Sequence, residues 1–161
     1  MLALTFTGCG TDPSMRNDLA ALPTARIAIN NQTFEVWLAT TQEQQRLGLM
    51  QVEADELAPI VPDASRGLPD GAHRGMLFVF DDDRLQAFWM YNTITALDIA
   101  YIRSDGRIVS TYTMAPLETK LYPSIEPAKF VLEVPAGLLA ELGIQRGDHV
   151  EIPPAVLKEL P

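Results

Sequence analysis

The sequence predicts an α+β domain rich in β-structure, folded as a curled sheet or small barrel of short strands with two short helices. Two observations lead to this prediction. Many short apolar segments are separated by Gly, Pro, Asn and Asp, the residues that favour turns. Two further segments carry the start and stop signals of helices. We expect residues 26–161 to form one globular domain and residues 1–25 to be a signal remnant and lipoprotein tether.

The N-terminal part of the expected domain begins with a hairpin. "RIAIN" (26–30) and "TFEVWLA" (33–39) alternate apolar and polar residues, as half-buried strands do, and a turn joins them. Residues 51–74 contain repeated Pro and Gly and predict a long irregular loop. A loop of that length in a compact domain is usually functional or mobile.

A short helix is predicted between these two segments, in "TQEQQRLGLM" (41–50). Thr40 followed by Glu43 indicates a capping box at its start. Arg46 and Met50 then lie one turn apart on one face of the helix.

The second half of the chain predicts further strands, a hairpin and a helix. Asp-Gly between 97–103 and 108–114 favours a tight hairpin turn. Pro and Gly bound a short helix in "PAGLLAEL". The remaining predicted elements are a strand at 75–80, an acidic turn at 81–84, an apolar strand near 86–91, a strand at 129–134 and a final strand after 147.

The most informative segment is "FWMYNTITALDIAYI" (88–102), because it keeps Asn92 and Asp98 among apolar residues. A buried charge without a partner is costly, so Asp98 needs a cation or backbone N–H donors. Arg46 is the cation that we expect to pair with it, and Asn92 is expected to tie the loop 92–97. These three residues form either a polar staple that fixes the fold, which we favour, or a polar site that faces a ligand.

Aromatic residues in the same segment alternate in direction. Trp89 and Tyr91 point to one side, and Phe88 and Met90 point to the other. We favour burial on both sides. If one side is open, it offers an aromatic platform beside Asn92, which suits a small molecule, a sugar or a peptide.

Charge and the single cysteine limit the partners and the location. The net charge is −9, and no Lys or Arg cluster could neutralise a row of phosphates, so we expect no nucleic-acid partner. "LTFTGC" resembles the lipobox of bacterial lipoproteins, with Cys9 as the acylated residue. We therefore expect a lipid anchor on the periplasmic side as the one link to a membrane; the alternative, if this match is accidental, is a cytoplasmic protein.

Catalytic and metal signatures are weak. His73 and His149 lack the spacing of a metal site, and no serine has the glycine frame of a hydrolase nucleophile. Four methionines recur in the shared segments: Met50, Met76, Met90 and Met114. Their sulfur atoms could bind Cu(I), but we favour packing in the core. We therefore expect no metal and no cofactor.

Seven segments in order resemble the domain of unknown function 192 family across residues 26–152: "RLGLM", "GMLFVF", "FWMYNTITALDIAYI", "DGRI", "MAP", "YPSIEPAKFVLEVPAG" and "GIQRGDHVEI". The family usually joins Arg directly to Gly-Leu-Met, whereas Leu47 separates them here. The resemblance implies no established reaction. The matching positions are Arg46, Gly48, Met50, Met76, Phe78, Phe80, Trp89, Met90, Asn92, Thr93, Asp98, Asp105, Gly106, Met114, Pro116, Ala128, Glu133, Gly137, Gly147 and Asp148.

Two functional hypotheses follow. The first is a non-enzymatic binding or accessory module whose groove is bounded by Arg46, Trp89, Asn92 and Asp98. The second is a hydrolase-like enzyme that acts on an envelope component with Asp98 or Glu133 as the base. Two carboxylates that open into one cleft would favour the enzyme, and one carboxylate locked to Arg46 would favour the staple or binding site.

Overall fold

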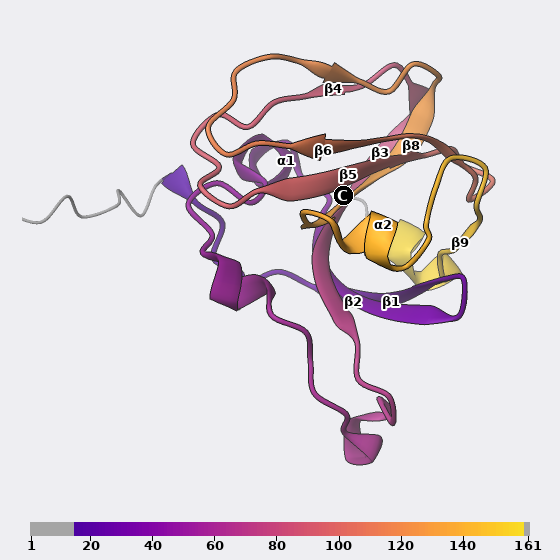
Figure 1. Cartoon of the computed structure of the whole chain (residues 1–161). Coiled ribbons are helices and arrows are strands. Elements are labelled where there is room, and N and C mark those ends of the chain that lie inside the picture. The colour runs from indigo at the N-terminus through magenta and orange to yellow at the C-terminus, as the bar shows by residue number, and fades with distance from the viewer. Residues whose placement is uncertain (1–14, 160–161) are drawn as a thin grey trace, which may run out of the picture.

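The computed structural model of the protein describes residues 15–159 and contains a seven-stranded sheet that curls into a half-barrel, with a two-stranded sheet packed beside it (Figure 1). The β-rich fold class expected from the sequence is confirmed. The strands of the large sheet, in chain order, are β1 (Thr24–Ile29), β2 (Gln32–Ala39), β3 (His73–Arg84), β5 (Leu97–Ile102), β6 (Ile108–Met114), β8 (Ala128–Pro135) and β9 (Val150–Glu151). The small sheet pairs β4 (Ala87–Phe88) with β7 (Tyr122–Pro123).

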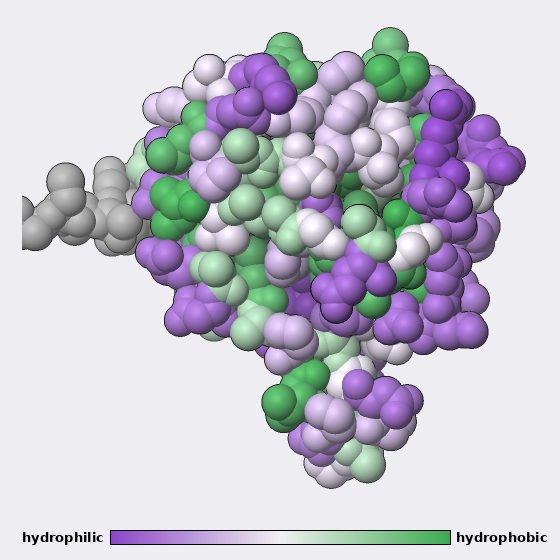
Figure 2. Space-filling model, in the orientation of Figure 1, coloured by the Kyte–Doolittle hydropathy of each residue, from purple (hydrophilic) through white to green (hydrophobic). Residues whose placement is uncertain are grey.

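The order of the large sheet is β6-β5-β8-β3-β2-β1-β9. Its neighbours are antiparallel except for β2 and β3, which are parallel. Parallel neighbours require a crossover connection, and here it carries one helix and two 3-10 turns. They are α1 (Gln42–Leu47), η2 (Ala54–Leu57) and η3 (Ala64–Arg66). The long loop predicted at 51–74 forms most of this crossover, and its tip around η3 stands away from the body of the molecule (Figure 2).

Apolar side chains cover both faces of the sheet. On one face, Met76, Ile99 and Val131 belong to a core cluster that includes Met90 and Tyr122 from the 88–92 segment and β7. On the other face, side chains from β1, β2, β5 and β8 meet α2 (Leu138–Glu141) and η4 (Pro154–Glu159). Figure 1 shows α2 inside the curve of the sheet, between the β1–β2 hairpin and β5. The central strands are therefore buried on both sides.

Helix α1 begins one residue later than the sequence predicts and ends earlier. Thr41 is the N-cap, and its hydroxyl accepts the N–H of Gln44, whose side chain completes the capping box. The predicted pairing of Thr40 with Glu43 is therefore wrong by one position. The helix ends at Leu47 because Gly48 leaves the helical region with φ of 48°.

Two strand predictions also need correction. The acidic residues 81–84 continue β3 and do not form a turn, because β3 runs through to Arg84 with a register shift against β8 after Val79. The segment 86–91 contributes only the two-residue strand β4 and leaves the large sheet to cover one of its faces. The hairpin of β5 and β6 forms as predicted.

Residues 15–159 include no helix that is long and apolar enough to cross a membrane. Cys9 and the predicted lipobox lie outside the described residues.

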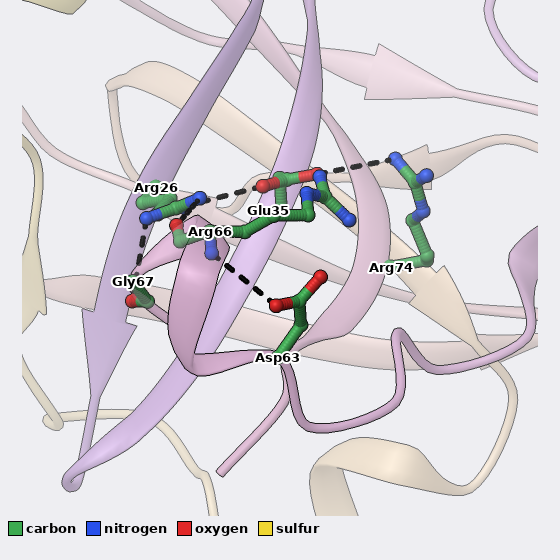
Figure 3. A network of polar contacts seen from close by, with 6 residues as sticks. All are labelled: Arg26, Glu35, Asp63, Arg66, Gly67 and Arg74. Carbon is green, nitrogen blue, oxygen red and sulfur yellow. Dashed lines mark hydrogen bonds and ion pairs between the residues drawn. The ribbon is translucent and has the colours of Figure 1, made fainter. Parts of the chain in front are cut away.

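A cluster of arginines around Glu35 fastens the crossover loop to the sheet (Figure 3). The nearly buried carboxylate of Glu35 accepts hydrogen bonds from Arg26 at 3.2 Å and Arg66 at 3.0 Å, and Arg74 lies 3.8 Å away. The Arg26 guanidinium also donates to the main-chain carbonyl of Arg66 at 2.7 Å. Since Arg66 belongs to η3, these side-chain contacts tie the projecting tip to β1 and β2.

Asp98 joins α2 to the sheet. Its side chain is 2% exposed and points to the face that α2 covers. One carboxylate oxygen accepts the hydroxyl of Thr113 at 2.6 Å, and the other accepts the backbone N–H of Leu139 at 3.0 Å. Thr113 lies directly opposite Asp98 on β6, and Leu139 lies in the first turn of α2. Asp98 is thus a structural connection between β5, β6 and α2.

The predicted pair of Asp98 with Arg46 is wrong. Arg46 makes a bidentate contact with Glu43 on its own helix, on the opposite side of the sheet from Asp98. Because the sheet separates them, the carboxylate is satisfied by neutral donors instead of by the guanidinium.

We predict that Asp98→Ala lowers the free energy of unfolding by about 2 to 4 kcal/mol, because it leaves the buried Leu139 N–H and the Thr113 hydroxyl without their acceptor. Asp98→Asn should cost about 1 kcal/mol less than Ala, since the amide oxygen still accepts one donor and its N–H₂ can donate to the hydroxyl. Denaturant midpoints measure both. Arg46→Ala is the control: coupling between Arg46 and Asp98 in a double-mutant cycle would contradict this account.

Candidate functional site

A cavity of about 700 Å³ opens between α1, the 86–93 segment and the sheet face formed by β3 and β8. Its walls come from three parts of the chain that are distant in sequence. The residues that line it are Gln42, Glu43, Gln45, Arg46, Leu47, Gly48, Leu49, Met50, Phe78, Phe80, Gln86, Ala87, Phe88, Trp89, Tyr91, Thr93 and Glu133. This set includes Arg46 and Trp89, two of the four ligand-binding residues predicted from the sequence.

Helix α1 is held over the cavity by contacts within the helix and at its C-terminal end. The side-chain N–H₂ of Gln45 donates to the carbonyl of Val79 on β3 at 2.8 Å. Asn17 donates to the carbonyl of Gly48 at 2.9 Å and so satisfies the C-terminal end of the helix. Gly48 has positive φ, and a Cβ atom there would lie 3.2 Å from the ring of Phe78, so only glycine fits this close approach.

The aromatic residues of the 88–91 segment divide between the core and the surface. Phe88 meets Phe78 edge to face at 4.8 Å, and Met90 is fully buried. Trp89 and Tyr91 are 48% and 43% exposed, and their rings stack at 5.1 Å with 25° between their planes. Burial on both sides, which the sequence analysis favoured, is therefore wrong. The open aromatic platform is the arrangement that forms, at the edge of the cavity.

Glu133 is a buried carboxyl that faces this cavity from β8. Its side chain points to the face opposite Leu132 and Val134, and the residue is 4% exposed. No side-chain hydrogen bond or ion pair involves it among residues 15–159, in contrast to Asp98. Burial alone raises the pKa of Glu133 from 4.5 to about 8. At neutral pH the carboxyl is therefore mainly protonated and can donate a hydrogen bond.

Gln86 brings a second unsatisfied group to the same cavity. Its side-chain nitrogen is buried and, within the described part of the chain, has no hydrogen-bond acceptor. The main chain of Gln86 is held in place: its N–H donates to the Ser124 hydroxyl at 3.0 Å, and its carbonyl accepts the Ser124 N–H at 2.9 Å. The backbone of this lining residue is thus fixed to the β7 segment, and its side-chain nitrogen is closed off from solvent.

The rim of the cavity on the α1 side carries one ion pair. Arg46 donates from two nitrogens to both oxygens of Glu43, at 2.8 and 2.6 Å. The hydrogen bond to Arg46 lowers the pKa of the Glu43 carboxyl, so Glu43 stays ionised at neutral pH. The pair contributes no net charge to the rim.

The other two predicted ligand-binding residues do not line the cavity. Asp98 lies on the opposite face of the sheet. Asn92 adopts a left-handed conformation with φ of 53°, and its carbonyl accepts the backbone N–H and side-chain N–H₂ of Gln51 at 3.0 and 3.1 Å. The loop is therefore tied through the main chain of Asn92, and its amide makes no hydrogen bond within residues 15–159. Asn is among the few residues that tolerate this conformation.

Metal ligands do not gather in the part of the chain that the structure describes: no three His, Cys, Asp or Glu side chains converge there. The four methionines are all buried. Met76, Met90 and Met114 belong to the core cluster beneath the small sheet, and Met50 lines the cavity.

A second hollow, of about 560 Å³, lies between β1, β9 and the turn at Gly106. Its histidine is His149, whose Nε2 lies 2.8 Å from the carbonyl oxygen of Asp105 and so already has a partner. This hollow lacks an unpartnered buried polar group among the described residues, which distinguishes it from the first.

The sequence marks Glu133 in the same way as Asp98, because "KFVLEV" places one acid in a strand that is apolar on both sides. This signal does not show which of the two acids has a partner. For Gln86 and Glu43, the sequence carries no signal that separates them from other surface residues.

Comparisons with known proteins give a family and no activity. The family model DUF192, described as "Uncharacterized ACR", matches residues 25–152. No curated protein matches the chain.

Two solved structures have the same fold. A protein from Sinorhizobium meliloti 1021, described as a candidate transcription regulator, is 30% identical with a TM-score of 0.69; the match covers 81% of this chain and 94% of that one. A protein of unknown function from Novosphingobium aromaticivorans DSM 12444 is 27% identical with a TM-score of 0.68, over 89% of this chain and 99% of that one.

We predict that Glu133→Gln stabilises the protein. The folded-state pKa of Glu133 lies above its unfolded-state value, so the native protein loses stability as pH rises from about 4.5 to 8. An amide of the same shape removes this loss, and the gain should be about 3 kcal/mol at pH 7 and close to zero at pH 4. Urea midpoints at both pH values measure it.

The control is Glu126→Gln, at a partly exposed glutamate that pairs with Arg146 outside the cavity, and its stability should not follow this pH profile. If Glu133→Gln is less stable than the original protein at pH 7, Glu133 has a partner that stabilises its ionised form, and the description of the cavity is wrong.

Proposed function

Since this chain belongs to the DUF192 family of uncharacterised proteins, we propose its function from the geometry of the cavity: a non-enzymatic binding or accessory module that holds part of a small molecule, a sugar or a peptide. The observation that carries this proposal is a buried carboxyl without a partner inside an aromatic cavity of about 700 Å³. The volume lies in the usual range for sites that bind small molecules.

The energetic balance supports a binding role. A buried polar group without a hydrogen bond costs about 1 to 3 kcal/mol, and among residues 15–159 the side-chain nitrogen of Gln86 is such a group. Burial also disfavours the ionised form of Glu133, as its raised pKa shows. Residues that destabilise the native state and open into one cavity are typical of functional sites. A ligand that forms a hydrogen bond with Glu133 recovers part of this cost on binding.

The aromatic platform supports a ligand with a planar or apolar face. The stacked rings of Trp89 and Tyr91 lie at the edge of the cavity, where the inner wall is formed by Phe78, Phe80 and Phe88. Aromatic faces bind rings and the C–H faces of sugars through dispersion and burial of apolar area. The ligand therefore extends from the platform into the cavity, with its polar group toward Glu133.

We also propose that the domain is displayed outside the cytoplasmic membrane by a lipid on Cys9. The support is the lipobox-like "FTGC" followed by a polar segment with two prolines. A net charge of −9 keeps the domain surface away from anionic lipid, so the acyl group is the membrane contact in this proposal.

A second candidate function is an enzyme that uses Glu133 as a general acid or base. The pKa of about 8 favours this candidate, because perturbed carboxyls in cavities often perform proton transfer. Asp98 faces the other side of the sheet, and Glu43 is bound to Arg46, so a second free carboxylate does not open into the cavity among the described residues. This arrangement supports binding over catalysis.

A regulatory role, as described for the Sinorhizobium protein, would have to act through a ligand or another protein. The net charge is −9, and the arginines that gather around Glu35 already contact its carboxylate, so contact with nucleic-acid phosphates is not favoured.

We predict that a fragment library screened by NMR yields ligands whose binding shifts the signals of Trp89 and Met50. Trp89→Ala should weaken these ligands about tenfold, because it removes half of the platform. Trp37→Phe, on a tryptophan that lies outside the cavity lining, should leave their affinity unchanged. Release of a covalent product from any fragment, abolished in Glu133→Gln, would favour the enzyme instead.

We predict that Cys9 is acylated in the native host. Metabolic labelling with a fatty-acid analogue should label the protein, and Cys9→Ser should remove the label and release the protein from the membrane fraction. A soluble cytoplasmic product that retains residues 1–8 would exclude the lipoprotein part of the proposal and leave the ligand-binding part intact.

A further inference from the structure

The two segments of the small sheet differ in the residues that protect a sheet edge. The segment that contains β7, "LETKLYPS" (117–124), carries two charged residues and a proline. Such residues keep an exposed edge from pairing with another chain. The opposite segment, "LQAFWMY" (85–91), has no charged residue and no proline. Its edge lacks this protection, which is typical of a strand that receives a partner.

The main-chain groups of the unprotected segment alternate in direction. Ala87 lies opposite Pro123, which has no N–H, so the ladder hydrogen bonds fall on the neighbouring residues. The carbonyl of Gln86 accepts a main-chain N–H from the β7 side, and the N–H of Met90 donates to that side. The N–H and C=O groups of Ala87 and Trp89 therefore point away from β7. In the part of the chain that the structure describes, they form no hydrogen bond.

The cavity lies along this free edge. Its lining includes Ala87 and Trp89 but no residue of 117–124, so it lies on the side of the segment that β7 leaves open. Helix α1 forms the wall across from the edge, and Phe78 and Phe80 of β3 belong to the inner wall. A strand of about four residues placed there, about 14 Å long, 4.8 Å wide and 10 Å deep, occupies roughly 650 Å³. The cavity of about 700 Å³ has room for it.

The row of main-chain groups favours a peptide over other occupants. Ala87 and Trp89 are two residues apart, which spaces their N–H and C=O groups by about 7 Å along the edge. An extended peptide repeats its own N–H and C=O groups at the same spacing, whereas a sugar or a single ring does not. A second copy of the chain is disfavoured, because each copy carries a net charge of −9 and the two repel each other.

We infer that the cavity binds an extended peptide segment that adds a strand to the 85–91 edge. The main chain of the peptide bonds to Ala87 and Trp89, and alternate side chains of the peptide enter the cavity and meet its aromatic inner wall. The side chains between them point outward and pack on the ring of Trp89. This inference rests on the proposed binding function and selects the peptide among its ligand classes.

An acetylated and amidated pentapeptide, Thr-Val-Phe-Val-Thr, tests the inference on the purified protein. NMR titration gives the dissociation constant, and the signals of Ala87 and Trp89 should shift on binding. Two N-methylated forms of the same peptide are the matched probes. One carries methyl groups on its second and fourth residues, and the other carries them on its third and fifth. Each removes the N–H donors from one edge of the extended peptide and leaves the other edge intact.

One of the two N-methylated peptides should bind at least tenfold more weakly than the parent, and the other should bind as the parent does. The reason is that only one edge of the added strand faces the protein. Loss of affinity in both, or in neither, would overturn strand addition.

Ala87→Pro tests the protein side of the same contact. It removes an edge N–H that makes no bond to β7, so the small sheet can still pair while peptide affinity falls at least tenfold. Leu121→Ala is the control, because it trims an exposed apolar side chain on the protected segment and should leave the affinity unchanged. The unfolding midpoint shows whether Ala87→Pro stays folded. If it does not, the N-methylated peptides decide.

Other occupants give different results. Tighter binding of maltotriose than of the pentapeptide would overturn the inference in favour of a sugar. A dimer in sedimentation that the pentapeptide dissociates would overturn it in favour of a second copy. If the pentapeptide does not bind while ring-containing fragments still shift Trp89 and Met50, the inference fails and the proposed binding function stands. If neither binds, both fail.

Discussion

The fold depends on the partners that it provides for acidic side chains on strands covered on both faces. Three acids are buried within the described residues, and each lies on a different strand: Glu35 on β2, Asp98 on β5 and Glu133 on β8. Glu35 is surrounded by three arginines, and Asp98 accepts one hydroxyl and one backbone N–H. Glu133 has neither kind of partner. The first two hold the fold together, and the third defines the candidate site.

The two structural acids also fasten the parts of the chain that surround the sheet. Through Glu35 and the arginines, the projecting crossover loop is attached to the β1–β2 hairpin (Figure 3). Through Asp98, α2 is attached inside the curve of the sheet. Both contacts join segments far apart in sequence, so they stabilise the tertiary arrangement directly.

The cavity itself results from the parallel arrangement of β2 and β3. Their crossover begins with α1, which lies over the sheet face and forms one wall. The 86–93 segment forms the other wall, because it leaves the large sheet after β3 and pairs with β7 instead.

Two residues in the turns next to this wall, Asn92 and Leu117, have left-handed backbone conformations. For Leu, which is bulky, this conformation is strained, and such strain persists where surrounding contacts fix it. Here the Leu117 N–H donates to the carbonyl of Thr93 at 3.0 Å, so the strained turn supports a residue of the cavity wall.

Local patterns in the sequence determined the β-rich class, the β5–β6 hairpin, the approximate places of both helices and the unusual character of Asn92 and Asp98. These features depend on alternation, turn residues and caps, which act over a few neighbouring positions. The tertiary structure alone decided which partner each polar group has. Arg46 binds Glu43 three residues away, Asp98 binds Leu139 across 41 positions, and Glu133 shares a cavity with Gln86. The reason is physical: the cost of burying a charged or polar group depends on what surrounds it in three dimensions, and side chains on opposite faces of a sheet cannot meet, whatever their charges favour.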